Sequence, residues 1–327
     1  MRWLITLLAV LLIFSLAPAV AAPKDELERS NVVFKVNNLN EPGATRYVHG
    51  YRIDPSCKAS TAVLLQHGLS YTGEAWDFPG YSYARKIAGA GYTVVAVDRL
   101  GYGRSKLSNG YKVSSEAYAH MAHQMVRQLR KAGFDHVVIG GHSAGAEVAE
   151  LEAGMYRDVD ALIAMGYHQW PAAPFLTQDF ITRDTISAFQ KDYVYFLGTP
   201  QHRAEMFYTG NADPAVVAAD TKAAVPTPSG EILSIGKQPS RLFASRVNAP
   251  VFLQLADSDR LFPLRFASMA KALFLSAPSV TLDKVPSAGH TYMLHRSSGP
   301  AAADRITAWL RSLENTPACG AHRAAER

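Results

Sequence analysis

The chain has little cysteine and little excess of either charge, and it lacks internal repeats and low-complexity tracts. Two of its 327 residues are cysteines, and they form neither a Cys-X-X-Cys motif nor a spacing typical of metal ligands. Its 33 basic and 28 acidic residues give a formal net charge of +5, and the basic residues are scattered. This pattern argues against a nucleic-acid-binding protein. A composition of 48% hydrophobic and 19% charged residues excludes a disordered or fibrous class.

Long hydrophobic runs are also missing, apart from one near the N-terminus. Arg2 precedes the apolar residues 4–16, and Ala19-Val20-Ala21 supplies the small residues that signal peptidase prefers. We interpret residues 1–21 as a signal peptide, so the mature protein is expected to be secreted or periplasmic, with no membrane span left. A retained anchor is the alternative, although the run is short for a span of roughly 20 residues.

The two cysteines lie far apart in the chain. Cys57 comes before the first apolar core strand, and Cys319 follows the last expected helix. In an exported chain they can form a disulfide, which would attach the C-terminal residues to the body of the protein. They can equally remain two free thiols, and the sequence leaves both possibilities open.

Most of the remaining chain alternates between apolar strands and helices. Residues 32–36 and 47–53 alternate apolar and other residues, as in an antiparallel entry hairpin. Further strands are expected at 61–65, 92–97, 137–139, 159–165, 250–255 and 280–285, and helices at 83–89, 118–129, 144–157, 264–275 and 305–313. This alternation predicts an α/β fold with a mostly parallel central sheet flanked by helices.

The alternation is interrupted once. Residues 169–248 are rich in aromatic side chains but show no strand–helix alternation, and we interpret them as an inserted, mainly helical cap or lid. A peripheral helical layer away from the site is the alternative. The core then consists of residues 22–168 and 249–314, and residues 315–327 form a polar C-terminal tail.

One short stretch carries the clearest chemical signal. The apolar residues 137–139 run into a helix through Gly141-His142-Ser143-Ala144-Gly145, which fits the nucleophile-elbow pattern G-x-S-x-G. A turn this sharp leaves no room for side chains at the two outer glycines. It would raise the hydroxyl of Ser143 above the sheet at a helix N-terminus, where developing negative charge is favoured.

Four local signatures in this order resemble the α/β-hydrolase superfamily, in which nucleophile, acid and histidine follow each other along the chain. The signatures are His67-Gly68 after an early strand, Asp98 to Ser105, the Ser143 elbow, and Gly289-His290 after the last strand. The resemblance covers residues 32–313 and implies the α/β-hydrolase fold. Its weakest part is the insertion.

The resemblance implies a catalytic triad. Ser143 would be the nucleophile, and His290, in a small-residue loop after a strand, would be the base. Asp259 matches the acid position of the family pattern G-x-x-D-x-x-x-P, but Ala256 replaces the glycine, so Asp257 stays a competitor.

Other residues receive smaller expected roles. The resemblance implies an oxyanion hole made by the backbone N–H groups of Leu69 and Ala144. His168 and Trp170, at the entry to the insertion, are expected to line the substrate pocket. His142 is expected to be structural, and Asp98 and Arg99 to brace the end of the sheet.

A metal site is not expected. His120 and His123 share one helix without an evident third ligand, so we interpret them as part of a solvated face. No cofactor is implied by the sequence.

The expected function is that of a secreted serine hydrolase acting on a small-molecule carboxylic ester or lactone through an acyl-enzyme. Other triad chemistry on the same fold, such as terminal peptide, amide or C–C bond hydrolysis, is the main alternative. A catalytically silent binding protein is a second alternative, which the filled triad positions disfavour. Epoxide hydrolases of this fold use an aspartate nucleophile, and Ser143 argues against that activity. Substrate identity and oligomeric state do not follow from the sequence.

Overall fold

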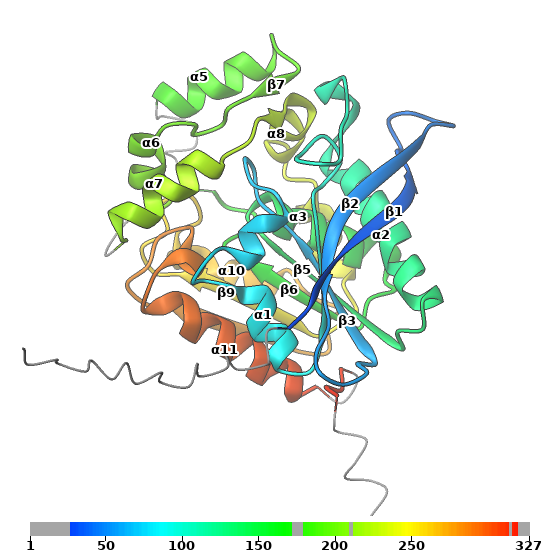
Figure 1. Ribbon diagram of the computed structural model, residues 1–327. Coiled ribbons are helices and arrows are strands. Elements are labelled where there is room, and N and C mark those ends of the chain that lie inside the picture. The colour runs from blue at the N-terminus through cyan, green and yellow to red at the C-terminus, as the bar shows by residue number, and fades with distance from the viewer. Residues whose placement is uncertain (1–26, 172–178, 209–211, 314–315, 320–327) are drawn as a thin grey trace, which may run out of the picture.

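The computed structural model describes residues 27–171, 179–208, 212–313 and 316–319 (Figure 1). The expected signal peptide and the end of the C-terminal tail therefore lie outside the described residues. Within these ranges, none of the helices combines the length and apolarity needed to span a membrane.

An eight-stranded sheet forms the centre of the molecule, in the order β1-β2-β4-β3-β5-β6-β9-β10. Strand β2 runs antiparallel to both of its neighbours, and the pairs from β4 to β10 are parallel. The mostly parallel sheet is thus confirmed. The strands are β1 (Arg29–Asn37), β2 (Thr45–Ile53), β3 (Thr61–Gln66), β4 (Thr93–Val97), β5 (His136–His142), β6 (Ala161–Met165), β9 (Val251–Ala256) and β10 (Val280–Val285).

Helices cover both faces of this sheet (Figure 1). Successive residues of a strand point to opposite faces: Val63 and Leu65 of β3 pack in one hydrophobic cluster, Ala62 and Leu64 in the other. The first cluster includes residues of α1 and α11, and the second includes residues of α2 and α3. These helices are α1 (Tyr83–Gly89), α2 (Ser115–Lys131), α3 (Ala144–Tyr156) and α11 (Ser298–Arg311), with η1 (Gly73–Asp77) and η2 (Gly110–Lys112) as short 3-10 turns.

Two expected helices differ from the structure. Helix α11 starts at Ser298 instead of residue 305, because Ala301 to Ala303 are strong helix formers without the large apolar residues that mark a periodic face. Pro300 is tolerated there because the first turn needs no N–H. The expected helix 264–275 is divided and shorter: η4 (Leu264–Phe266) precedes α10 (Ala267–Ala272). A last 3-10 turn is η5 (Tyr292–Leu294).

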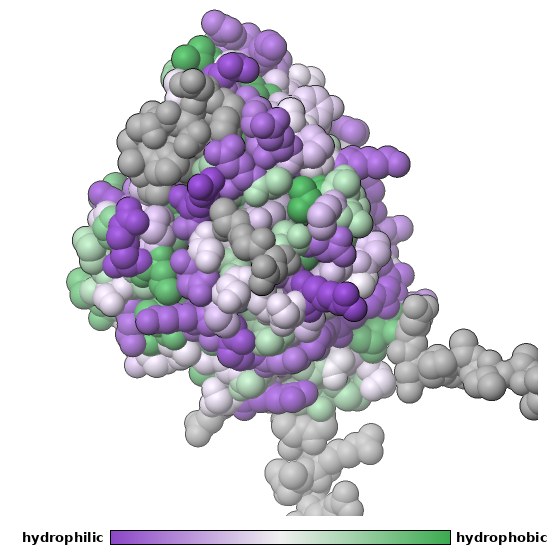
Figure 2. Space-filling view, turned by 90° about the vertical axis from the view of Figure 1, so that its left-hand side faces the viewer, coloured by the Kyte–Doolittle hydropathy of each residue, from purple (hydrophilic) through white to green (hydrophobic). Residues whose placement is uncertain are grey.

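The insertion, residues 169–248, separates β6 from β9 and occupies the upper and left part of Figure 1. It packs on loops that follow β4: Gly101 adjoins Pro228, and Gly110 adjoins Asp192. Figure 2 shows the side of the molecule that lies on the left in Figure 1. On this side, the described residues are a mixture of hydrophilic and hydrophobic ones. Its elements are α5 (Asp179–Ala188), β7 (Tyr193–Val194), α6 (Pro200–Met206), α7 (Pro214–Ala223), β8 (Thr227–Pro228), α8 (Ser229–Ile235), α9 (Ser240–Phe243) and η3 (Ala244–Arg246).

The aromatic residues of the insertion differ in burial. Phe196, Phe207 and Tyr208 are buried, whereas Phe189 and Tyr195 are exposed. The insertion is mainly helical, as expected, but β7 and β8 pair as a small antiparallel sheet that the sequence did not indicate. Phe175, another aromatic residue of the insertion, lies outside the described residues.

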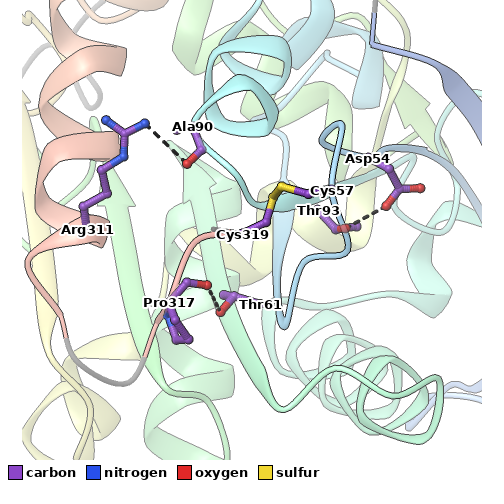
Figure 3. Close-up of a disulfide and its surroundings, with 8 residues drawn as sticks. All are labelled: Asp54, Cys57, Thr61, Ala90, Thr93, Arg311, Pro317 and Cys319. Atoms are coloured by element: carbon purple, nitrogen blue, oxygen red, sulfur yellow. Dashed lines mark hydrogen bonds between the residues drawn. A yellow bond between two sulfur atoms is a disulfide. The ribbon is translucent and has the colours of Figure 1, made fainter. Parts of the chain in front are cut away.

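A disulfide joins Cys57 to Cys319, with 5.8 Å between their Cα atoms (Figure 3). Around it, the Cys319 N–H donates to the carbonyl of Gly91, and the Thr61 hydroxyl donates to the carbonyl of Pro317. Residues 316–319 are therefore packed against the body of the protein, where the sequence suggested a polar tail.

Candidate active site

The turn between β5 and α3 has the strained shape expected of a nucleophile elbow. Ser143 has φ 55° and ψ −125°, a conformation that non-glycine residues rarely adopt. Its N–H donates to the carbonyl of Met165 at 2.8 Å. A Cβ on Gly141 would lie 2.1 Å from the carbonyl oxygen of Gly145, and one on Gly145 would lie 2.2 Å from that of Gln66. Both glycines are required because backbone packs on backbone at this turn.

His290 and Asp259 form a buried pair in the loops that follow β10 and β9. The Nδ1 of His290 lies 2.8 Å from Oδ2 of Asp259. The other carboxylate oxygen accepts from the backbone N–H groups of Leu261, at 2.8 Å, and Phe262, at 3.0 Å. This arrangement favours the tautomer with the proton on Nδ1. Nε2 is then an acceptor, and among the described residues it has no hydrogen-bond partner.

Asp257, the competing candidate for the acid, faces a different group of atoms. Its carboxylate accepts from the N–H groups of Ser287, at 3.0 Å, and Ala288, at 3.4 Å, and from the hydroxyl of Ser258, at 2.9 Å. Partial desolvation opposes ionisation, but these hydrogen bonds outweigh it and lower the pKa of Asp257. Asp257 thus caps the turn that precedes His290, and the structure brings Asp259 to the histidine instead.

His142 supports the backbone of His290. Its Nε2 lies 2.9 Å from the carbonyl oxygen of His290, and the two ring centroids are 4.7 Å apart. Burial, followed by the charge of His290, lowers the pKa of His142 to about 3, so this ring is neutral. A Cβ on Gly166 would lie 2.9 Å from His142 and 3.5 Å from His290. Because Gly166 directly follows Met165, the partner of the Ser143 N–H, the serine and histidine loops meet at this glycine.

The loop after β3 approaches the elbow closely. A Cβ on Gly68 would lie 3.2 Å from the Cβ of Ser143. Two hydrogen bonds of His67 hold the loop: its Nε2 accepts from the Arg99 N–H at 3.0 Å, and its Nδ1 lies 2.8 Å from the carbonyl of Gly68. Within the described part of the chain, the N–H groups of Leu69 and Ala144 have no acceptor. Both are therefore free to donate, and they follow Gly68 and Ser143 directly in the chain.

A buried ion pair attaches the insertion to the loop after β4. Arg99 pairs with Glu231 of α8, whose second carboxylate oxygen accepts from the hydroxyl of Tyr102. Arg99 therefore braces the end of the sheet, as expected, but does so through the insertion. Glu231 could not be predicted from the sequence, because it lies in a segment without a recognisable motif.

A second buried cluster lies beside the loop that follows β3. Arg203 of α6 is 3.6 Å from Asp220 of α7 and donates to the hydroxyl of Ser70 at 3.1 Å. Tyr71 donates to Asp220 at 3.1 Å. Ser70 adopts φ 62°, so this cluster holds a strained residue next to Leu69. Sequence reasoning missed all four residues.

An apolar cavity of about 360 Å³ lies beside the His290 pair. Trp170 lines it, and Phe262 connects it to the site because its ring lies 5.6 Å from that of His290. His168 does not line it: its side chain is fully buried and its Nε2 lies 3.1 Å from the carbonyl of Pro263. Its ring packs against Phe262 and Phe266, with centroids 5.5 and 6.1 Å apart, so these side chains separate it from the cavity. The lining consists of Tyr167, Gln169, Trp170, Pro171, Ile235, Gly236, Gln238, Arg241, Phe262 and Phe266.

One expectation about histidines is corrected. His123 is not on a purely solvated face, because Glu152 and Asp158 lie beside it. The sequence does not reveal this grouping, since its members come from α2, from α3 and from the loop after α3.

Comparisons with known proteins agree with this architecture. The thermophilic esterase from Thermogutta terrifontis has a TM-score of 0.67 at 19% identity, covering 86% of this chain and 98% of that one. The monoacylglycerol lipase of Paleococcus ferrophilus has a TM-score of 0.65 at 19% identity, covering 80% and 98%. At these identities the likeness shows the fold alone.

Sequence comparison supplies the family. Epoxide hydrolase B of Mycobacterium tuberculosis is 32% identical over 117 residues, which span 34% of this chain and only 30% of that enzyme. A family model described as the alpha/beta hydrolase family matches residues 62–304. Since this match covers more than half of the chain, the protein belongs to the alpha/beta hydrolase family.

Proposed function

We propose that the protein is a serine hydrolase that cleaves a carboxylic ester or lactone, with Ser143, His290 and Asp259 as its triad. One observation carries the proposal: the strained elbow that presents Ser143 adjoins a buried His290–Asp259 pair whose Nε2 has no described partner. A serine hydroxyl becomes a useful nucleophile only when such a nitrogen takes its proton.

The proposed reaction has two halves. Nε2 of His290 accepts the proton of Ser143 as its oxygen attacks the ester carbonyl, and the N–H groups of Leu69 and Ala144 donate to the oxyanion. His290 then protonates the leaving alcohol, which gives an acyl-enzyme. Water, deprotonated by His290, releases the acid and restores Ser143. Asp259 keeps the imidazole in the tautomer that the cycle needs.

Epoxide opening, the activity named for the relative from Mycobacterium tuberculosis, fits Ser143 poorly. Attack of a serine oxygen on an epoxide would form an ether, and water at neutral pH does not cleave ethers. The enzyme would stop after one turnover. An acyl-enzyme ester, in contrast, is hydrolysed by the same histidine that helped to form it. Ser143 therefore favours acyl chemistry over epoxide chemistry.

The cavity beside Phe262 indicates what kind of ester would fit. Its described lining is mostly apolar, with Trp170 beneath the guanidinium of Arg241, 5.1 Å from the ring centroid. A volume of about 360 Å³ lies within the range of small-molecule sites. We infer a small substrate with an apolar acyl or alkyl part, and we infer that the insertion acts as a lid over it.

We further propose that the protein works outside the cytosol. The signal-peptide pattern of residues 1–21 supports export, and the disulfide between Cys57 and Cys319 is a bond that persists in oxidising compartments. N-terminal sequencing of the exported protein should find Ala22 first. An intact Met1 in a membrane fraction would favour an anchor.

Active-site labelling tests the nucleophile. A fluorophosphonate probe should label the parent protein once, and Ser143→Ala should lose both the label and the hydrolysis of p-nitrophenyl esters while keeping its circular dichroism spectrum. Full labelling of the Ser143→Ala variant would overturn the assignment.

Two aspartates two residues apart offer a matched test of the acid. Asp259→Asn should lower ester turnover by about 10⁴-fold, because the histidine loses the tautomer it needs. Asp257→Asn removes the same charge from the turn cap and should affect mainly stability. Equal activity of the two variants would refute the role of Asp259.

A further inference from the structure

His123, Glu152 and Asp158 come together at the far end of α3 from Ser143. The three residues offer one imidazole nitrogen and two carboxylate oxygens, all within 4.8 Å of one another. The Nδ1 of His123 lies 2.8 Å from Oδ2 of Asp158. Helix α2 packs against α3, so the three residues come from two neighbouring helices and from the loop that follows α3.

Glu152 is the most deeply buried of the three residues, and its carboxylate lacks a described partner. Its side chain is fully buried, and neither of its carboxylate oxygens has a hydrogen-bond partner among the described residues; nor does Oδ1 of Asp158. A buried carboxylate beside a second carboxylate requires either a proton or a cation between them.

The neighbouring charged and titratable side chains are already engaged. Arg130 donates to Asp160 at 2.7 Å and to the carbonyl of Asp158 at 2.7 Å, and it forms no ion pair with Glu152 within the described residues. His120 contacts the hydroxyl of Tyr156 at 2.7 Å. The oxygens of Glu152 thus face a position that no described side-chain cation fills.

The surroundings suit a positive ion. Helix α3 ends at Tyr156, and Arg157 follows with φ 57°, so the negative end of the helix dipole lies next to Asp158. The ring of Tyr156 stacks on that of His123 with centroids 4.0 Å apart, which holds the imidazole plane. The side chains of His123 and Asp158 are 18% and 29% exposed, so an ion could reach Glu152 from solvent.

We propose that His123, Glu152 and Asp158 bind a divalent transition-metal ion, with zinc as the best match. Imidazole nitrogen with carboxylate oxygen is a ligand set for zinc, whereas magnesium and calcium prefer oxygen alone. Tetrahedral ligands at zinc distances lie roughly 3.3 Å apart, so a small closure of the three side chains completes the site and water supplies the fourth ligand. The metal would bind the lone pair of His123 Nδ1, and the proton of the neutral imidazole would stay on Nε2.

The site would tie the end of α3 to α2 and would stabilise the fold without taking part in the reaction. It lies apart from Ser143, His290 and Asp259, and the proposal does not depend on the ester hydrolase function. Zinc should therefore raise the melting temperature and leave the basal rate of ester hydrolysis unchanged.

Titration of zinc chloride into tag-free, chelator-treated protein tests the proposal. Calorimetry should give one zinc ion per chain. Magnesium and calcium should give no comparable heat. Glu152→Gln and His123→Ala should each weaken zinc binding at least tenfold and lose the zinc-induced rise in melting temperature.

His136→Ala is the matched control. His136 also stands beside an aspartate, 3.4 Å from Asp160, but Arg130 already occupies that carboxylate. This variant should bind zinc like the parent. A parent protein without a one-to-one zinc isotherm, or zinc binding that survives both Glu152→Gln and His123→Ala, would overturn the proposal and leave a shared proton between the two carboxylates.

Discussion

Buried carboxylates occur in two parts of this molecule with opposite surroundings. Where the insertion meets the core, Glu231 faces Arg99 and Asp220 faces Arg203. Along α3, the buried Glu147, Glu150 and Glu152 form no ion pair with a described residue. The paired carboxylates join two segments of the chain. The α3 glutamates have no described cation that offsets the free-energy cost of removing them from water.

The difference shows in how these groups titrate. Burial raises the pKa of Glu147 to about 8, although the hydroxyls of Ser115 and Tyr167 donate to it at 2.7 and 2.8 Å. Burial also raises the pKa of Glu150 and of Glu152. The α3 glutamates therefore couple the stability of the core to pH, and the paired carboxylates determine how the insertion is held.

Glu231→Gln should have the largest effect of the variants that separate these two parts. It leaves Arg99 as a buried charge without a counterion, a change that typically costs about 3–5 kcal/mol of unfolding free energy. Urea unfolding at neutral pH measures the loss. Glu147→Gln, which removes no ion pair, is the control. A loss equal to that of the control would erase the distinction between paired and unpaired carboxylates.

Arg203→Met should rank second. It removes the donor to Ser70 and the partner of Asp220, but burial already raises the pKa of Asp220, so that carboxyl can take up a proton. We expect a loss of about 2 kcal/mol, together with slower ester hydrolysis because Ser70 holds the loop of Leu69. Unfolding and turnover should be measured on the same samples. Unchanged turnover despite lost stability would restrict Arg203 to a role in packing.

Glu147→Gln should have an effect that is small over a single pH unit and accumulates as the pH rises. The folded-state pKa of Glu147, about 8, lies above its ordinary value of 4.5, so its contribution to stability is complete below pH 4.5 and is lost as pH rises towards 8. Over this window the parent should lose up to about 1.4 kcal/mol per pH unit relative to Glu147→Gln. Thermal unfolding at several pH values tests this. Parallel pH profiles of the two proteins would mean that Glu147 does not titrate in this range.

Local patterns in the sequence predicted much of the fold. Apolar runs bounded by glycine or turn residues located the strands of the central sheet, and the periodicity of residues 118–129 marked α2, which spans Ser115–Lys131. The start of α11 was missed because alanine stabilises a helix without producing an amphipathic pattern. The pairing of β7 with β8 was missed because strands of two residues have no periodicity to detect.

The residues of the candidate site also differ in how far local sequence patterns could predict them. Short motifs in loops that follow strands were enough to single out Ser143, His290 and Leu69 as candidates. Which of Asp257 and Asp259 faces the histidine depends on how one loop folds back. The partners Glu231 and Arg203 could not be foreseen, because tertiary contact alone brings the insertion to these loops.

The disulfide determines how the chain would respond to force. Cys57 and Cys319 are separated by 262 positions in sequence, yet their Cα atoms lie 5.8 Å apart. A pull applied to the two ends of the oxidised chain would pass through this bond and bypass almost the whole sheet. Of the strands and helices in the described residues, only β1 and β2, at residues 29–53, would carry load. Reduction would release a further contour length of roughly 900 Å, so the bond acts as a mechanical shunt around the catalytic core.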